Sequence, residues 1–391
     1  MNHSADQQAS RASSVFLWGF IAVLTVIGLA YIAKGALIGA TAHHPIDLTY
    51  IWTAQQKVMH GQDPYAGDLP SPYPPPTFVL GATFMWPSSW TVARGYWTAI
   101  NLVAIATTAL WAFRLGRPFG RSRGCLLAAS FIAMGSICHT LGLGQAGVVV
   151  TAMLVLLLWL EEKRSPVAQG LVLGASFFKP QISGLFVLSY LAKRRWDVVI
   201  VAGIYSLAAW LVVCWVTHAP VLECFEVWGR MSKAGVLDHG NPSPYRLLQM
   251  MGMSAPAALK VTGLVIVTAT LITSIVYRRR SMLVQFAIVA VGGRLCTYHG
   301  TYDDVMLVFL LMVLGVEMLY DPRSRATIGF VLTGLSLWMP ARMGDHASYA
   351  IFQLLAWPVA LAVLLSITPH ECTSGVESSD APDVSKEVVA T

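Results

Sequence analysis

Charged residues are scarce in this sequence. Asp, Glu, Lys and Arg make up 12% of the 391 residues, whereas hydrophobic residues make up 55%. A soluble globular domain carries roughly a quarter charged residues, so this composition excludes an ordinary water-soluble fold. Four stretches lack charged side chains, and each can hold one or two membrane helices of about 20 residues: 15–33, 95–113, 124–160 and 198–222. We therefore expect an all-α, polytopic integral membrane protein.

Paired cysteines and internal repeats are also lacking. The six cysteines are scattered, without a CxxC pair or a metal-ligand spacing, and are expected to act as small apolar residues. No repeat relates the two halves of the chain, which counts against transporter folds built from repeats. The first apolar segment exceeds the roughly 7 to 15 residues of a signal-peptide core, so we expect a retained membrane helix.

The basic residues, which give a formal net charge of +6, lie in short clusters between the apolar segments. Under the positive-inside rule, the five clusters at 114–123, 163–164, 193–195, 278–280 and 323–325 face the cytoplasm. The helices between them must then come in pairs, which predicts about 12 crossings with both termini inside. The expected segments are 15–37, 93–113, 124–141, 145–160, 166–179, 181–192, 197–218, 258–277, 281–296, 304–320, 326–340 and 348–367.

This topology places the two longest loops, residues 38–92 and 219–257, on the periplasmic or outer side. Residues 1–367 are expected to form a single membrane domain. The polar tail, residues 368–391, is rich in Ser and acidic residues, and we expect it to be disordered in the cytoplasm.

Three segments depart from simple membrane spans. The apolar piece 77–86 is too short to cross, and is expected to lie at the outer interface. Residues 47–60 predict an amphipathic helix with one apolar face. Lys179-Pro180 interrupts the segment 166–192, which predicts two short helices meeting at an outward-facing turn.

Asp47 follows the first predicted span and is expected at the water boundary. A partly desolvated carboxylate there can stay ionised and act as a base. A helix cap or a solvated surface residue is the other interpretation. The segment that follows contains Gly61 to Tyr65 and Ser71 to Pro76, and its prolines predict a stiff lid over this loop.

The first external loop resembles the amino-terminal signature of glycosyltransferase family 87, which includes polyprenol-phosphate-mannose-dependent α-mannosyltransferases of bacterial membranes. The residues that carry this resemblance are Asp47, Tyr50, Ala54, Gly61, Pro64-Tyr65, Tyr73-Pro74-Pro75, Pro87, Ala93, Trp97 and Asn101. Later matches, in the same order, are Gly144-Gln145, Gly170, Gly174, Lys179-Pro180, Lys193-Arg194-Arg195-Trp196, Asn241, Ser243, Tyr298 and Tyr302-Asp303. The resemblance spans roughly residues 40–315.

The resemblance implies a GT-C fold, with many membrane helices and juxtamembrane helices in the first external loop. It also implies that Asp47 is the general base that deprotonates an acceptor hydroxyl. The donor would be a polyprenyl-phosphate sugar, most often mannose, and the sugar would be transferred with inversion. The expected location is the bacterial cytoplasmic membrane, with the active site facing the periplasm or exterior. The expected acceptor is a glycolipid, a polysaccharide or a protein.

A phosphate leaving group at such a site needs positive charge. Lys179 is the first candidate, because a lone Lys in an apolar helical pair is costly unless it faces a polar cavity or a partner. It can instead snorkel to the lipid headgroups or pair with an internal acid. Arg246 in the second external loop and Arg294 near the end of the ninth predicted helix are further candidates.

Other polar residues are candidates for sugar or acceptor binding. They are Tyr50, Tyr65, Tyr73, Gln145, Gln181, His299, Tyr302 and Asp303. The glutamines can alternatively join helices by hydrogen bonds, and Asp303 can cap the helix that follows it. Asp303 and Asp304 could bind a divalent cation, but neighbouring helical carboxylates point in different directions. We therefore expect no cofactor, with a divalent cation left open.

Two other functions compete with sugar transfer. A multi-span transporter or lipid flippase would share the helix count, but should keep its ionisable residues near mid-membrane. This sequence concentrates them in the external loops and at the helix mouths. A catalytically inactive assembly partner is the third interpretation. The membrane glycosyltransferase is the function that the sequence favours, and no nucleic-acid partner is expected.

Overall fold

The computed structural model describes residues 3–41, 47–67, 71–84, 89–238, 243–296, 299–340, 343 and 346–367. Within these ranges every regular element is a helix, as expected. The expected tail, residues 368–391, and the motif residues Pro87, Asn241 and Tyr298 lie outside the described ranges.

The helices follow one another with short connections; η marks a 3-10 helix. The first part of the chain forms α1 (His3–Thr41), α2 (Asp47–Met59), α3 (Pro76–Phe84), α4 (Trp90–Gly116), η1 (Arg117–Phe119), α5 (Arg121–Ile132), α6 (Gly135–Leu143), α7 (Gly147–Glu162), α8 (Pro166–Ser176), α9 (Pro180–Ser183), η2 (Gly184–Phe186), α10 (Val187–Ala192) and α11 (Trp196–Val216). The second part forms α12 (Val221–Asp238), α13 (Pro244–Met250), α14 (Ala255–Val276), α15 (Met282–Cys296), η3 (Thr301–Leu307), α16 (Val308–Tyr320), α17 (Arg325–Trp338) and α18 (Ala347–Ser366).

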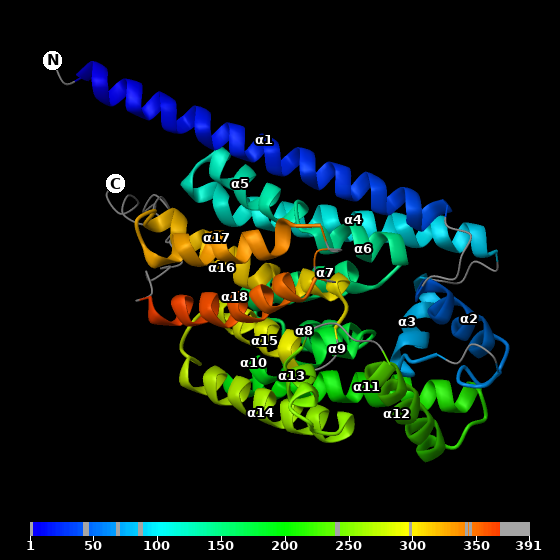
Figure 1. Ribbon diagram of the computed structural model, residues 1–391. Coiled ribbons are helices and arrows are strands. Elements are labelled where there is room, and N and C mark those ends of the chain that lie inside the picture. Colours follow the sequence, from blue (N-terminus) through cyan, green and yellow to red (C-terminus); the bar gives the residue numbers. More distant parts are fainter. Residues whose placement is uncertain are drawn as a thin grey trace, which may run out of the picture.

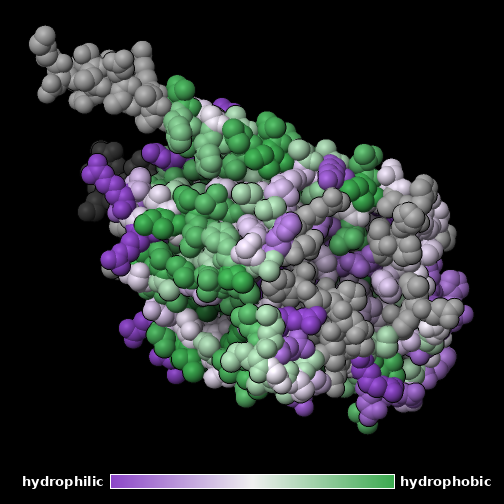
Figure 2. Space-filling view, viewed as in Figure 1, coloured by the Kyte–Doolittle hydropathy of each residue, from purple (hydrophilic) through white to green (hydrophobic). Residues whose placement is uncertain are grey.

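Five helical stretches among the described residues are long and apolar enough to cross a membrane. They are residues 14–41 of α1, residues 90–119 over α4 and η1, and the whole of α11, α14 and α18. The pair α5 and α6 also qualifies, bent by 48°, if it forms one span. Only 17% of the most apolar window of α14 is buried, so its side chains face outward. Figure 2 shows such apolar side chains over much of the visible face. The protein is therefore an all-α membrane protein.

The twelve predicted crossings correspond to helices of unequal length. Several are well below the roughly 20 residues that a straight crossing needs; α8 has 11 residues and α10 has 6. The count of twelve stays a prediction. Residues 77–84 of the apolar piece lie in the nine-residue helix α3, which is too short to cross, as expected.

Glycines let the helices approach closely, as is common in membrane bundles. A Cβ atom at Gly170 of α8 would lie 2.4 Å from Cβ of Val201 on α11. A Cβ at Gly35 of α1 would lie 2.7 Å from the carbonyl oxygen of Cys138 on α6. In Figure 1 the long helix α1 runs along one side of the bundle, beside α5 and α6.

The most buried part of the bundle is formed by α15, η3 and α16. Residues 284–294 and 303–315 are buried without interruption. The rings of Phe186, Phe286 and Phe309 meet edge to face, with centroids 4.9 to 5.6 Å apart. Such rings pack with offset or perpendicular geometry because their faces are negative and their edges positive. This rigid core supports η3, which carries Asp303.

The first loop contains the amphipathic helix that the sequence predicts. In α2 the side chains of Leu48, Ile51, Ala54, Gln55 and Val58 are buried, which confirms the expected apolar face. This face packs against α3 and also touches α4 and α11.

The second loop differs from the expectation, because residues 219–257 contain two helices, α12 and α13. Charged residues interrupt α12, so no long apolar run marks it, although it is amphipathic. Trp228 of α12 packs on Trp210 of α11 at 5.8 Å, and its Nε1 donates to the carbonyl oxygen of Pro72 at 3.2 Å. The second loop thus lies against the proline-rich segment of the first loop.

Candidate active site

Four segments that are distant in sequence meet where the first loop contacts the helix bundle. Asp47 opens α2, Gln145 lies in the turn between α6 and α7, Lys179 precedes α9, and Asp303 lies in η3. Gly144 adopts φ 66°, a left-handed conformation that suits glycine, and so ends α6 directly before Gln145. Lys179-Pro180 breaks the helical path as predicted, because the proline cannot continue the hydrogen bonding of α8.

Gln145 joins the first loop to the helix bundle. Its Nε2 donates to Asp47 Oδ2, while its Oε1 accepts from Lys179 Nζ at 2.8 Å and from Tyr73 Oη at 3.3 Å. The Lys179 ammonium can only donate hydrogen bonds, so the oxygen end of the Gln145 amide must face it. The Nε2 group must then face Asp47, where an ionised carboxylate is the matching acceptor. The network thus favours Asp47 as a carboxylate.

Lys179 is completely buried, with 0% of its side chain exposed. Its Nζ lies 2.5 Å from Asp303 Oδ1 and 4.6 Å from the centroid of the Tyr302 ring. A buried ammonium is stable only when its hydrogen bonds and charge are matched. Of the alternatives that the sequence left open for Lys179, the structure has the pairing with an internal acid.

Asp303 also contacts His299, whose Nδ1 lies 3.0 Å from Asp303 Oδ2. His299 Nε2 lies 2.8 Å from the carbonyl oxygen of Gly293. Both ring nitrogens of His299 thus lie within hydrogen-bonding distance of an oxygen atom. Burial alone would raise the pKa of Asp303, but Lys179 and His299 hold that pKa below its ordinary value.

A second buried ion pair lies beside the first. Arg294 Nε donates to Asp304 Oδ1, and the Arg294 guanidinium lies 5.0 Å from the ring centroid of Trp357. The neighbouring carboxylates of Asp303 and Asp304 therefore serve different partners, as their helical spacing predicts. The Asp303 carboxylate contacts the side chains of Lys179 and His299, so it acts as an ion-pair partner.

The proline-rich segment holds Tyr73 over this network. Tyr65 Oη donates to the carbonyl oxygen of Tyr73 at 3.0 Å, and Thr77 Oγ1 donates to that of Phe178 at 2.9 Å. Burial, together with the charges of Asp47 and Asp303, raises the pKa of Tyr73 well above its ordinary value. Tyr73 therefore stays a hydroxyl donor at neutral pH.

Three predicted site residues lie apart from this network. Tyr50 is 36% exposed on α2, and Gln181 is exposed on α9. Arg246 of α13 donates to Gln249 at 3.2 Å and lies 5.7 Å from the ring of Tyr245. Among the described residues, no hydrogen bond or ion pair connects these three side chains to Asp47 or Lys179.

Two buried residues of α4 were not selected as site candidates in the sequence analysis. Trp97 Nε1 donates to the carbonyl oxygen of Gly144 at 2.8 Å and so supports the turn that carries Gln145. Arg94 of α4 is 6% exposed and lies 5.6 Å from the ring of Trp90. A lone charge in an apolar helix is the signal that selected Lys179, and it could have selected Arg94 as well.

Metal ligands are not clustered in the part of the chain that the structure describes. No group of three or more His, Cys, Asp or Glu side chains there could hold a metal ion.

Together these contacts place two carboxylates, those of Asp47 and Asp303, and the ammonium of Lys179 in one polar network. The Asp47 side chain lies at its edge and is half-buried, whereas Gln145, Lys179 and Asp303 are at most 3% exposed. A carboxylate held at the border of a water-poor site can accept a proton, and nearby cations can stabilise an anionic leaving group.

Comparison with known proteins identifies the family. The model of glycosyltransferase family 87 matches residues 72–298, which is more than half of the 391-residue chain. The match includes Tyr73, Gln145 and Lys179, whereas Asp47 and Asp303 lie outside it and join the network through the fold. No curated protein and no solved structure matches the chain. The chain therefore belongs to glycosyltransferase family 87.

Proposed function

We propose that the protein transfers a sugar from a polyprenyl-phosphate donor to an acceptor hydroxyl at the outer face of the cytoplasmic membrane. Mannose is the proposed sugar, and a glycolipid, polysaccharide or protein is the proposed acceptor. The observation that carries this proposal is the chain of contacts from Asp47 through Gln145 to Lys179. It connects a candidate base to a candidate cation within a family of membrane glycosyltransferases.

In this proposal Asp47 is the general base. Its carboxylate takes the proton from the acceptor hydroxyl as that oxygen attacks the anomeric carbon. The bond from the anomeric carbon to the phosphate oxygen breaks on the opposite face, so the configuration inverts. The products are the new glycoside and polyprenyl phosphate, and Asp47 releases its proton to water. Gln145 supports this role because its Nε2 donates to Asp47 Oδ2 and so orients the carboxylate.

The leaving phosphate is proposed to draw on Lys179, Arg246 and Arg294. Lys179 and Arg294 are each paired with an acid, so a phosphate that contacts either one must compete with Asp303 or Asp304. Arg246 forms no ion pair with an acid among the described residues, so it is the cation that a phosphate reaches without such competition.

Sugar recognition is proposed to use the remaining polar groups around the network. Tyr65, Tyr73 and Gln145 line its first-loop side, and His299, Tyr302 and Asp303 line its bundle side. Tyr50 is close to Asp47 in the sequence, and Gln181 is close to Lys179. Both side chains are exposed, and we propose that they contact the acceptor. The proposed topology has both termini in the cytoplasm and the network on the outer side, in agreement with the positive-inside distribution of basic loops.

Radiolabelled sugar tests this function. Purified protein is incubated with polyprenyl-phosphate mannose, and separately with a mannose nucleotide, in the presence of membrane extract. The proposal predicts a labelled glycoside from the lipid-linked donor alone, and inversion at the anomeric carbon by NMR. Turnover with the nucleotide sugar alone would contradict the proposed donor. Flux of the lipid in proteoliposomes, without a covalent product, would instead indicate a transporter or flippase.

A further inference from the structure

A pocket lined mostly by basic residues lies at the other end of the helices that carry the candidate active site. It has a volume of about 420 Å³, within the ~300 to 1,000 Å³ of small-molecule sites. Its lining residues are Glu161, Ala192, Lys193, Arg194, Arg195 and Arg278. They come from the end of α7, the turn between α10 and α11, and the segment after α14. Four basic side chains therefore face one acidic side chain.

The position of α11 separates this pocket from the candidate active site. The first loop reaches the carboxyl end of this helix, where Gly61 lies against Val216. The pocket lies at the amino end, directly before Trp196. The 21 residues of α11 span about 30 Å at 1.5 Å per residue. The pocket is therefore a separate feature on the opposite side of the bundle.

The cations of the pocket are held in different ways. Arg195 Nη1 lies 2.9 Å from Glu161 Oε2, so its charge is already matched. Lys193 Nζ donates to the carbonyl oxygens of Arg278 and Arg280, at 3.2 and 2.8 Å. It thereby joins the turn between α10 and α11 to the segment between α14 and α15. Burial lowers the pKa of Lys193, although the charge of Glu161 opposes this effect. An anion in the pocket would stabilise the charged form of Lys193 and so offset the effect of its burial.

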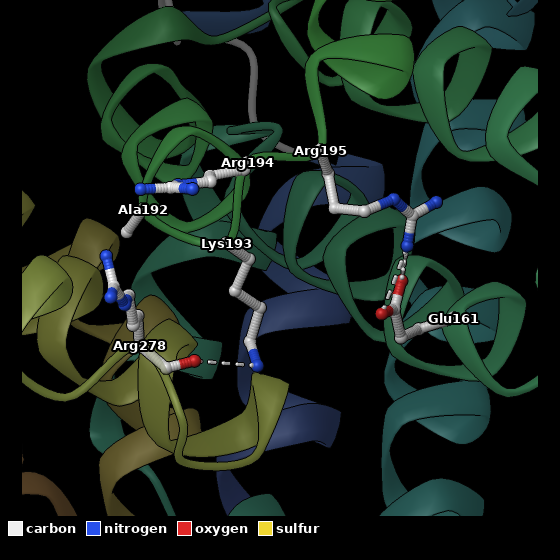
Figure 3. Close-up of a pocket in the computed structure, with 6 residues that line it drawn as sticks. All are labelled: Glu161, Ala192, Lys193, Arg194, Arg195 and Arg278. Carbon is white, nitrogen blue, oxygen red and sulfur yellow. Dashed lines mark hydrogen bonds and ion pairs between the residues drawn. The ribbon is translucent and has the colours of Figure 1, made fainter.

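Arg194 and Arg278 are the cations with unmatched charge. Neither forms an ion pair with an acid among the described residues, and both are exposed. Figure 3 shows their guanidinium groups at one edge of the pocket, away from the pair of Arg195 and Glu161. Arg194 has φ 58°, a left-handed conformation that disfavours residues with a side chain. Two nearby guanidiniums repel each other unless an anion lies between them.

The helix α11, which begins beside the pocket, has an exposed apolar face. Trp196 is 57% exposed, and Ile200, Ile204 and Leu207 continue the same face of α11 at 59 to 63% exposure. A tryptophan next to basic residues at a helix end is typical of the membrane–water interface. Acyl chains can lie along this face of α11 while a headgroup occupies the pocket. A soluble anion would not use that apolar face.

We propose that this pocket binds the phosphate headgroup of an anionic phospholipid, with Arg194 and Arg278 as its phosphate contacts and the acyl chains along α11. Guanidinium groups suit this role because their planar donors match phosphate oxygens. The predicted topology, with the basic loops inside, puts the pocket on the cytoplasmic side. Basic groups between membrane helices meet anionic lipid headgroups there.

Lipid titration of the purified full-length protein tests this proposal. Native mass spectrometry in detergent measures the bound fraction of phosphatidylglycerol and of phosphatidylcholine. The double variant Arg194→Gln/Arg278→Gln should lose the preference for phosphatidylglycerol, with affinity about tenfold lower or more. The matched control, Arg164→Gln/Arg279→Gln, removes two exposed arginines outside the pocket, and Arg164 has a similar backbone conformation, φ 51°. This control should keep the wild-type preference.

Two results would overturn the proposal. Equal binding of phosphatidylglycerol by the pocket variant and the control would exclude these arginines as its contacts. Displacement of the lipid by inorganic phosphate at equal concentration would show a site for soluble phosphate. If the double variant fails to fold, the single variant Arg278→Gln gives the same comparison, since it changes only one exposed side chain.

Discussion

The ammonium of Lys179 lies 2.5 Å from the carboxylate of Asp303, although the two residues are 124 positions apart in the chain. Both side chains are at most 2% exposed. The pair joins the break between α8 and α9 to the 3-10 turn η3. Because either charge alone would be costly in this buried place, the pair helps to fix how these segments meet.

Removing one partner should destabilise the protein strongly. Lys179→Met leaves Asp303 buried with reduced compensation, and we expect a loss of about 3 to 5 kcal/mol in the free energy of unfolding. Thermal unfolding in detergent should show this loss of stability as a lower midpoint temperature for Lys179→Met. The control is Asp197→Asn, which breaks an exposed contact with Arg195 and should cost at most about 1 kcal/mol. Equal midpoints for the two variants would contradict the importance of the buried pair.

The pair should also give acid sensitivity. The pKa of Asp303 is lower in the folded protein than its ordinary value, so the charged pair stabilises the fold above about pH 4. This contribution is lost as the pH falls through the folded pKa. The difference in unfolding temperature between wild type and Asp303→Asn should therefore be constant from neutral pH to about pH 5 and should shrink below about pH 4. A difference that grows on acidification would contradict the direction of this shift.

A charge placed at Gln145 should move the pH dependence of activity. Gln145→Glu sets a second carboxylate against Asp47, and the repulsion between the two negative charges should make Asp47 harder to ionise. The acidic limb of the profile of kcat/KM against pH should then move to higher pH. Gln62→Glu adds the same charge at an exposed position of the first loop and should leave the limb unchanged. If both variants give the wild-type profile, Asp47 does not control the acidic limb.

The close packing of α8 on α11 should depend on Gly170. In Gly170→Ala the new methyl group would lie 2.4 Å from Cβ of Val201 and 2.9 Å from the carbonyl oxygen of Val198. Since backbone must shift to relieve this clash, we expect a loss of about 1 to 3 kcal/mol of stability. Gly203→Ala is the matched control, because it lies on α11 with no atom within 4 Å of its new methyl group. Equal unfolding temperatures for the two variants would be inconsistent with this packing.

The local parts of this fold could be predicted from the sequence. Apolar runs marked the membrane helices, and the period of Ile51, Ala54 and Val58 marked the buried face of α2. The break at Lys179-Pro180 followed from the chemistry of proline. The two helices of residues 219–257 were missed, because charged side chains on an amphipathic helix leave no continuous apolar run.

The partners within the site could be predicted only in part. Asp47, Gln145, Lys179 and Asp303 were each selected as candidates, but their contacts join residues from 34 to 124 positions apart. Such contacts depend on how helices pack, which no local pattern encodes. For the same reason, Tyr50 and Gln181 were selected with equal weight although both are exposed.

The central claim is that Asp47 is the base in a reaction that uses a lipid-linked sugar. The most direct test measures sugar transfer from polyprenyl-phosphate mannose by Asp47→Asn, a nearly isosteric change at a half-buried side chain. We predict that transfer falls by at least about 100-fold, the scale of a general base, while the unfolding temperature stays close to that of wild type. Asp63→Asn, at an exposed acid of the same loop, should keep wild-type activity. If folded Asp47→Asn transferred sugar as fast as Asp63→Asn, the assignment of the base would be wrong.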